Sequence, residues 1–139
     1  MSKPSFEINR FDRLIAIQLK GQWHSAIDLE YLSELGQVMQ RMRQSTWAIV
    51  ADFRDWYIDD EIAQLNTHYS LHLDRRNQIS ECWIVRNSSQ AEHLDPFFKD
   101  LDFKPQRVLD QPQLKTWGKQ TGIDLTPSFE DLFFPPSKT

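Results

Sequence analysis

Residues 47–53 read Trp-Ala-Ile-Val-Ala-Asp-Phe, a short run in which Asp52 is the only polar residue. Apolar residues at consecutive rather than alternate positions predict a strand that is buried on both faces. Residues 14–20 and 82–85 show a similar pattern, with the sequences Leu-Ile-Ala-Ile-Gln-Leu-Lys and Cys-Trp-Ile-Val. Strands of this kind lie at the centre of a mostly parallel sheet covered by helices, so the sequence predicts an α/β fold.

Further strands and helices are predicted on either side of these three strands. Helix starts are indicated by capping residues or by a proline in the first turn, each followed by apolar residues at helical spacing. We expect strands at residues 6–10 and 106–109, and helices beginning at Ser25, at Asp59 or Asp60, at Ser89 and near Pro112. Pro96 is expected to break or restart the third helix.

The order of these elements predicts the architecture. A tight turn at residues 12–13 makes the first two strands antiparallel, and the later strands alternate with helices. Strands that alternate with helices form parallel pairs. The predicted fold is therefore a single-layer mixed, mostly parallel five-stranded sheet with four helices.

Composition and charge exclude several classes of protein. The chain has 139 residues, enough for one domain, and its formal net charge of −4 is opposite to that expected of a nucleic-acid-binding protein. The single cysteine, Cys82, cannot form an intrachain disulfide, and no stretch approaches the roughly 20 apolar residues of a membrane helix. Because the N-terminus lacks the apolar core of a signal peptide, we expect a cytoplasmic protein with no membrane span.

Residues 1–122 carry all of the predicted strands and helices, and residues 123–139 form a tail rich in proline and phenylalanine. Prolines in the tail disfavour regular secondary structure. Full burial would stabilise each large apolar side chain by about 1.5–3 kcal/mol. We therefore expect the tail to dock on its own domain or on a partner subunit. Its docking residues are Phe129, Leu132, Phe133 and Phe134.

Four segments of this chain resemble the STAS fold, and within it the SpoIIAA-like group of small bacterial proteins. Residues 14–21 look like the second strand with its closing glycine, and residues 52–56 look like the exit of the third strand. Residues 81–85 match the fourth strand, and residues 107–110 are similar to the short last strand before the final helix. The resemblance covers roughly residues 5–121 and implies a STAS/SpoIIAA-like domain at residues 1–122.

This resemblance implies a regulatory or binding domain without chemistry of its own. STAS domains act in switching between protein partners, and some bind small or apolar ligands. The anti-sigma-factor antagonists carry a phosphorylatable serine after the third strand, but residues 54–60, Arg-Asp-Trp-Tyr-Ile-Asp-Asp, contain no serine or threonine. We therefore predict a non-enzymatic domain that binds a protein partner or a small apolar ligand without that phosphorylation.

The predicted binding site lies where two neighbouring strands end. Ligands of open α/β sheets often bind at the carboxyl ends of the strands, and aromatic residues with a polar edge are favoured in interfaces. The candidate residues are Trp23, His24, Arg54, Asp55, Trp56, Tyr57, Asp59 and Asp60. Two alternatives stay open: the aromatic residues cap the core, and the carboxylates complement the dipole at a helix start.

A second class of function would use His24 and Asp55 as the acid–base pair of a small hydrolase or metal-dependent enzyme. No motif for a nucleophile or a nucleotide accompanies these residues, so we expect no catalytic residue, no cofactor and no bound metal. A third possibility is a homodimer formed through the tail or a helix face.

Overall fold

The computed structural model describes residues 3–70, 73–122 and 129–135, with the backbone alone at residues 67–70 and 129–130. Its strands (β), α-helices (α) and 3-10 helices (η) are, in chain order, β1 (Ser5–Phe11), β2 (Leu14–Gln22), α1 (Ser25–Arg41), β3 (Trp47–Tyr57), α2 (Asp60–Ser70), β4 (Gln78–Ile84), η1 (Glu92–Phe98), β5 (Gln106–Val108), α3 (Gln111–Gln120) and η2 (Phe129–Leu132).

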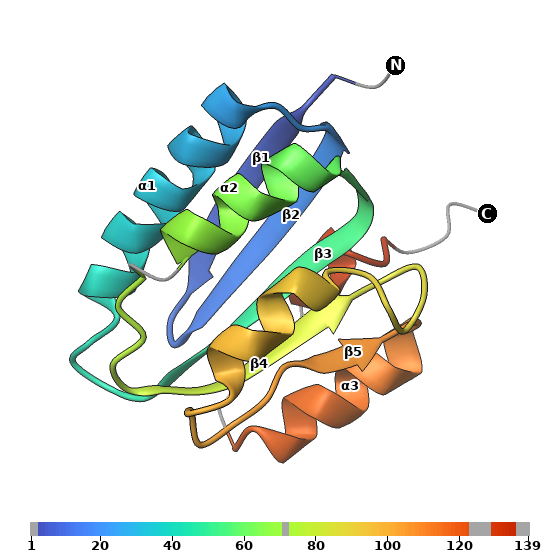
Figure 1. Cartoon of the computed structure of the whole chain (residues 1–139). Helices are drawn as coiled ribbons and strands as arrows, with labels where there is room; N and C mark the ends of the chain where they lie inside the picture. The colour runs from blue at the N-terminus through green and yellow to red at the C-terminus, as the bar shows by residue number, and fades with distance from the viewer. Residues whose placement is uncertain (1–2, 71–72, 123–128, 136–139) are drawn as a thin grey trace.

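Five strands form one sheet in the order β1-β2-β3-β4-β5 (Figure 1). β1 is antiparallel to β2 and the other neighbouring pairs are parallel, which confirms the predicted mixed sheet. The predicted third helix is the 3-10 helix η1, which begins at Glu92 rather than Ser89 and contains Pro96, a residue without the N–H of a regular α-helix. The tail, for which we predicted no regular structure, contains the single 3-10 turn η2.

Helices cover both faces of the sheet, with α1, α2 and η1 on one side and α3 on the other (Figure 1). The larger core includes Ile15 and Ile17 of β2, and the smaller core includes their neighbours Leu14 and Ala16 together with Phe133 of the tail. Consecutive residues of a strand point to opposite faces. The unbroken apolar runs of the sequence therefore supply both cores.

β3 continues to Tyr57, whereas the sequence predicted an end at Phe53. Residues 55–57 pair with residues 20–22 of β2, while the pairing of β3 with β4 stops at Asp52. We predicted that residues 54–57 follow the strand as a loop, and this is wrong. They belong to β3 because β2 continues to pair with β3 beyond the apolar run. The end of β3 thus projects beyond β4 at the carboxyl edge of the sheet.

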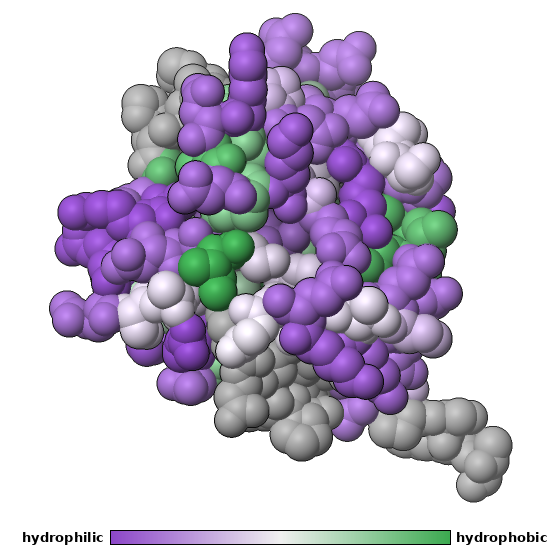
Figure 2. Space-filling view, turned by 90° about the horizontal axis from the view of Figure 1, so that it is seen from below, coloured by the Kyte–Doolittle hydropathy of each residue, from purple (hydrophilic) through white to green (hydrophobic). Residues whose placement is uncertain are grey.

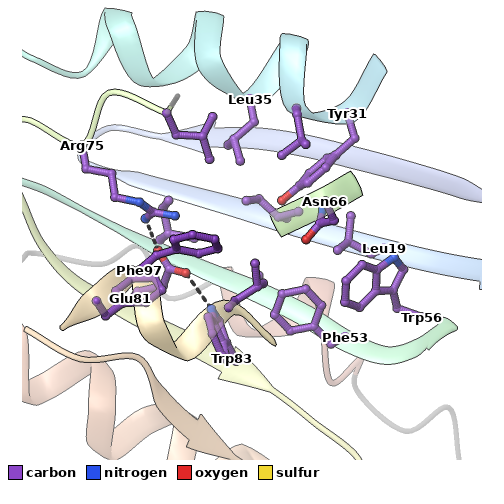
Figure 3. Close-up of a pocket in the computed structure, with 17 residues that line it drawn as sticks. Leu19, Tyr31, Leu35, Phe53, Trp56, Asn66, Arg75, Glu81, Trp83 and Phe97 are labelled. Atoms are coloured by element: carbon purple, nitrogen blue, oxygen red, sulfur yellow. Dashed lines mark hydrogen bonds and ion pairs between the residues drawn. The ribbon is translucent and has the colours of Figure 1, made fainter. Parts of the chain in front are cut away.

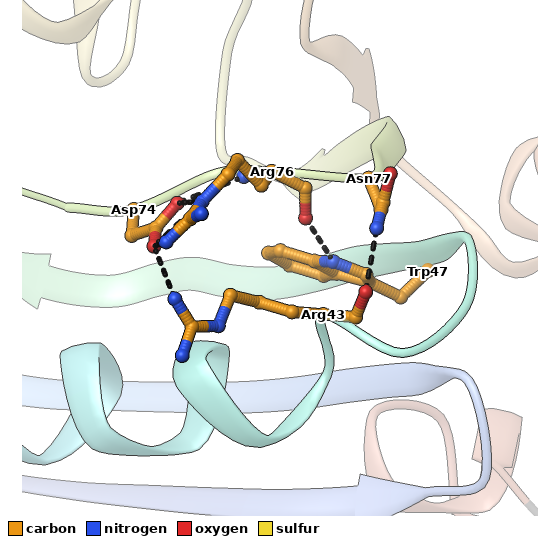
Figure 4. A network of polar contacts seen from close by, with 5 residues as sticks. All are labelled: Arg43, Trp47, Asp74, Arg76 and Asn77. Carbon is orange, nitrogen blue, oxygen red and sulfur yellow. Dashed lines mark hydrogen bonds and ion pairs between the residues drawn. The ribbon is translucent and has the colours of Figure 1, made fainter.

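A polar network closes the opposite, amino end of β3 and β4 (Figure 4). The Asp74 carboxylate accepts from the guanidinium groups of Arg43 at 3.4 Å and Arg76 at 2.7 Å. Trp47 donates its indole N–H to the carbonyl of Arg76 at 2.8 Å, and the Asn77 amide donates to the carbonyl of Arg43 at 2.5 Å. These contacts join the end of α1 to the starts of β3 and β4, and one carboxylate is shared by two guanidinium groups.

Candidate functional site

Trp23 and Trp56 lie at the carboxyl edge of the sheet, but both are buried in the larger core. Their side chains are 2% and 3% exposed, and their rings meet edge to face with centroids 5.8 Å apart. Trp23 also donates its indole N–H to the carbonyl of Lys20 at 2.9 Å. The alternative that these tryptophans cap the core therefore describes them. A register shift between Asp52 and Asp55 adds one residue to β3 relative to β2, so Trp56 faces the same core as Phe53.

Tyr57 is the aromatic residue of this edge that faces outward, with 43% of its surface exposed. The guanidinium of Arg86, two residues after the end of β4, lies 4.4 Å from the centre of the Tyr57 ring. The same guanidinium donates to the carbonyl of Arg54 at 2.6 Å and to that of Trp56 at 3.2 Å. Sequence reasoning missed Arg86, although its position one residue after a buried strand-like run places it at the same sheet edge.

Gln90 completes the support of the projecting end of β3. Its amide N–H group donates to the carbonyl of Phe53, and its amide oxygen accepts from the backbone N–H of Arg86 at 2.8 Å. Because β4 ends before β3 does, these carbonyls have no strand partner on that side, and side chains satisfy them instead. Tyr57 is therefore presented by a backbone that is hydrogen-bonded on both sides.

The acidic residues of the predicted site lie close in sequence but have different roles. Asp59 accepts from the backbone N–H of Ile62 at 2.9 Å and so caps α2, and Asp60 is the first residue of that helix. This matches the alternative of carboxylates at a helix start. Asp55 is exposed. Across residues 3–70, 73–122 and 129–135, no three histidine, cysteine or acidic side chains are grouped as metal ligands.

His24 is the N-cap of α1. Its Nδ1 atom accepts from the backbone N–H of Ile27 at 3.4 Å, so this nitrogen serves the helix. Within the described part of the chain, His24 forms neither a hydrogen bond nor an ion pair with Asp55. The acid–base pair of the hydrolase hypothesis is therefore not assembled in this structure.

The side chain of Arg54 contacts the tail on the face of the smaller core. It forms a two-point ion pair with Asp52, at 3.0 and 2.9 Å, and this hydrogen bonding raises the pKa of the Arg54 guanidinium. The same group donates to the carbonyl of Phe133 at 2.6 Å and lies 4.6 Å from the centre of the Phe134 ring. The structure therefore uses the Arg54 side chain to hold the tail, while the Arg54 carbonyl accepts from Arg86.

The tail residues that the structure describes pack on their own chain. Phe133 is 3% exposed within the smaller core, and Leu132 and Phe134 are partly buried against it. The amide of Gln18 donates to the carbonyl of Leu132 at 2.7 Å. The side chain of Phe129, the fourth predicted docking residue, lies outside the described residues.

A cavity of about 30 Å³ lies between the sheet and the helices of the larger core (Figure 3). Its walls are mainly apolar and include Phe53 and Trp56, with polar groups from Asn66, Arg75 and Glu81. A cavity of this size holds one or two water molecules, whereas pockets for drug-sized ligands measure about 300–1,000 Å³. This cavity therefore has room for water and not for a drug-sized ligand.

A buried polar chain links the three helices above this cavity. The Asn66 amide donates to the Asp28 carboxylate at 2.8 Å, and the Asn66 oxygen lies 3.0 Å from Nε2 of His93. Desolvation raises the pKa of Asp28 and lowers the pKa of His93. Both shifts favour uncharged side chains, as burial away from water requires. One Asp28 oxygen and the indole N–H of Trp56 are buried, and neither has a hydrogen-bond partner among the residues that the structure describes.

Comparisons with known proteins support the fold. No family model matches this sequence, and no curated protein matches it. Among solved structures, an anti-sigma factor antagonist from Mycobacterium paratuberculosis superposes with a TM-score of 0.51 at 13% sequence identity, covering 82% of this chain and 93% of that one. The chain therefore has the STAS-like fold that its sequence resembles, and at this identity the likeness concerns the fold alone. None of the helices in the described ranges combines the length and apolar composition of a membrane span.

Proposed function

We propose that this chain is a non-enzymatic regulatory domain that binds a protein partner at the carboxyl edge of its sheet. The contact surface consists of Tyr57 and Arg86, flanked by His24, Asp55, Asp59 and Asp60, and we call it the carboxyl-edge surface. The observation that carries this proposal is the exposed Tyr57 ring held against the Arg86 guanidinium. Tyrosine and arginine are enriched among the residues that dominate the binding energy of protein interfaces.

Two further observations support a protein partner. The solved structure with the same fold is described as an anti-sigma factor antagonist, and we extend from that protein a role in regulation by protein binding. Seen from below the view of Figure 1, on the side away from the carboxyl edge, the described surface is largely hydrophilic with small, separate hydrophobic patches (Figure 2). This side does not resemble an obligate apolar interface, which agrees with a reversible contact elsewhere on the domain.

The proposed binding needs no phosphorylation at the start of α2. Residues 54–60 contain no serine or threonine, and the Asp59 side chain already occupies the helix cap. We therefore propose that partner binding is controlled elsewhere in the chain or by the partner itself. A reducing, cytoplasmic setting belongs to the same proposal, because the single cysteine is buried and unpaired.

Replacing Tyr57 by alanine tests this proposal. A partner is first identified by crosslinking and mass spectrometry in cells that express the protein, and its affinity is then measured by calorimetry. We expect Tyr57→Ala to weaken binding at least 10-fold, because it removes the central ring of the surface, and Tyr57→Phe to retain most of the affinity.

Ile79→Ala is the matched control for this experiment. Ile79 is 38% exposed and lies near the amino end of β4, at the opposite edge of the sheet from Tyr57. It should therefore leave the affinity unchanged. Equal binding by wild type and by a folded Tyr57→Ala variant would overturn the assignment of the carboxyl-edge surface.

A further inference from the structure

The polar residues of the two central strands form a pair on the face that carries the tail. Gln18 interrupts the apolar run of β2, Asp52 interrupts that of β3, and the two residues lie opposite each other in the parallel register. Both precede the carboxyl edge, and Arg54 follows Asp52 on the same face of β3. An apolar core gains nothing from such a row, because burying an ion pair is seldom more stabilising than apolar packing.

All three residues of this row are used to hold one segment of chain. Gln18 donates to the carbonyl of Leu132, and Arg54 donates to the carbonyl of Phe133 while its guanidinium lies against the Phe134 ring. Asp52 acts through Arg54, because its two carboxylate oxygens accept hydrogen bonds from the guanidinium and orient it. The row contacts main-chain carbonyls and an aromatic ring. These are groups that a peptide segment from another protein can also present.

We infer that Gln18, Asp52 and Arg54 form a peptide-binding row that the residues Leu132, Phe133 and Phe134 occupy as an internal ligand. The site takes a turn segment with two adjacent phenylalanines, which follows the 3-10 helix η2. The first ring is buried in the smaller core, and the second lies against the guanidinium of Arg54. The expected partner is a protein that carries such a segment. The tail of this chain occupies the row until the partner displaces it.

The chemistry of the row agrees with exchange of its occupant. The ion pair of Arg54 with Asp52 is formed within β3, so the guanidinium stays oriented when the segment leaves. Within its described part the tail has no strand pairing with the sheet, and its main-chain carbonyls are held by the side chains of Gln18 and Arg54. This inference is independent of the carboxyl-edge surface, which lies around Tyr57.

A labelled peptide tests the inference, with the sequence of residues 129–135, Phe-Glu-Asp-Leu-Phe-Phe-Pro. Its binding to the full chain is measured by fluorescence polarisation. Phe133→Ala combined with Phe134→Ala weakens the internal ligand, so this double variant should bind the peptide at least 10-fold more tightly than wild type, with which the tail competes. Adding Gln18→Ala or Arg54→Ala to the double variant should reduce that binding at least 10-fold, and Tyr57→Ala should not change it.

Several outcomes would overturn the inference. The first is a folded double variant that does not bind the peptide. The second is a peptide affinity that Gln18→Ala and Arg54→Ala leave unchanged. A wild-type dimer that reverts to monomer when both phenylalanines are replaced would assign the row to the tail of a second copy instead of a different protein. Light scattering measures this.

Hydrogen exchange on the wild type keeps the inference testable if the double variant does not fold. The backbone amides of residues 132–134 should exchange by local opening, at least 10-fold faster than those of residues 48–52 in the centre of β3. Exchange of both segments at the single rate of global unfolding would show that the tail is a fixed part of the core, and would overturn the inference.

Discussion

Consecutive residues at the end of β3 have opposite surroundings. Trp56 packs against Trp23 in the core, while Tyr57 faces outward against the guanidinium of Arg86. A period of two along the strand assigns them to opposite faces. The three aromatic residues that looked alike in the sequence therefore divide into two core residues and one surface residue, and Tyr57 alone carries the proposed contact.

Asp28 shows why single polar residues inside the core also matter. It lies on α1 with no exposed surface, and it depends on the amide of Asn66 as its hydrogen-bond donor. Removing the partner of a buried carboxylate leaves its desolvation uncompensated, which costs about 1–3 kcal/mol. The hydrogen bond from Asn66 of α2 to Asp28 of α1 is therefore expected to stabilise the fold more than a hydrogen bond on the surface does.

We predict that Asn66→Ala lowers the free energy of unfolding by about 2 kcal/mol at pH 7, as measured by urea denaturation. Asp28→Asn should be at least as stable as wild type at this pH. The asparagine keeps the acceptor for Asn66 and has no carboxylate to desolvate. Because the folded-state pKa of Asp28 is raised, wild type should lose stability as the pH rises above the unfolded value of 3.8, and Asp28→Asn should lack this loss. Equal stability of Asn66→Ala and wild type would contradict the stabilising role of the hydrogen bond between Asn66 and Asp28.

At the scale of elements, three glycines differ in backbone conformation and in how closely other atoms approach them. Gly21, near the end of β2, has a φ of +86°, and a Cβ atom there would come within 2.4 Å of the carbonyl oxygen of Lys3. Gly122, after α3, has a φ of +70° with open space around it. Gly36 lies inside α1, where a Cβ atom would meet a Leu73 methyl group at an ordinary 3.9 Å.

These three glycines predict three different results for substitution by alanine. Gly21→Ala should destabilise the fold by at least about 2 kcal/mol, since it combines a left-handed backbone with a clash against main chain. Gly122→Ala should cost about 1 kcal/mol, from the backbone conformation alone. Gly36→Ala should raise stability by about 0.5–1 kcal/mol through helix propensity. Thermal unfolding checks all three, and a Gly21→Ala variant as stable as Gly122→Ala would show that the approach of Lys3 is not required.

At the scale of the whole molecule, opposite charges are paired in local groups at the two ends of the sheet. Asp74 joins Arg43 and Arg76 at the amino end, and Asp52 joins Arg54 at the carboxyl end. Hydrogen bonds from Arg76 lower the pKa of Asp74 to about 2. A carboxyl group with a lowered pKa stabilises the fold above its unfolded pKa, and that contribution disappears as the pH falls through the folded value.

We therefore predict that part of the stability of the wild type is lost between about pH 4 and pH 2, as Asp74 is protonated. Asp74→Asn should be less stable than wild type at pH 6 and should show a smaller decrease across this window. Denaturation at a series of pH values measures the effect, and added salt should reduce it because the pair is partly exposed. Asp100→Asn, at an exposed residue outside the network, is the control. An identical decrease for Asp74→Asn and wild type would contradict the prediction.

The sequence by itself determined the class of the fold. The mainly apolar runs at residues 14–19, 47–53 and 82–85, interrupted only by Gln18 and Asp52, predict strands buried on both faces. This pattern is local in the sequence and can be read without knowing any tertiary contact. Helix starts at Ser25 and Asp60 were also visible, because capping is a contact between near neighbours in the chain. The resemblance to the STAS fold rested on the same local patterns, and the solved structure with this fold agrees with it.

Only the tertiary structure decided what happens at the edges of the sheet. The continuation of β3 to Tyr57 depends on its pairing with β2, the burial of Trp23 depends on Trp56, and the position of Arg86 depends on where β4 stops. The peptide-binding row likewise joins Gln18 and Asp52, which are far apart in the chain, to a tail more than 70 residues away. Such contacts are set by register and distance between strands, and a pattern of neighbouring residues contains neither quantity.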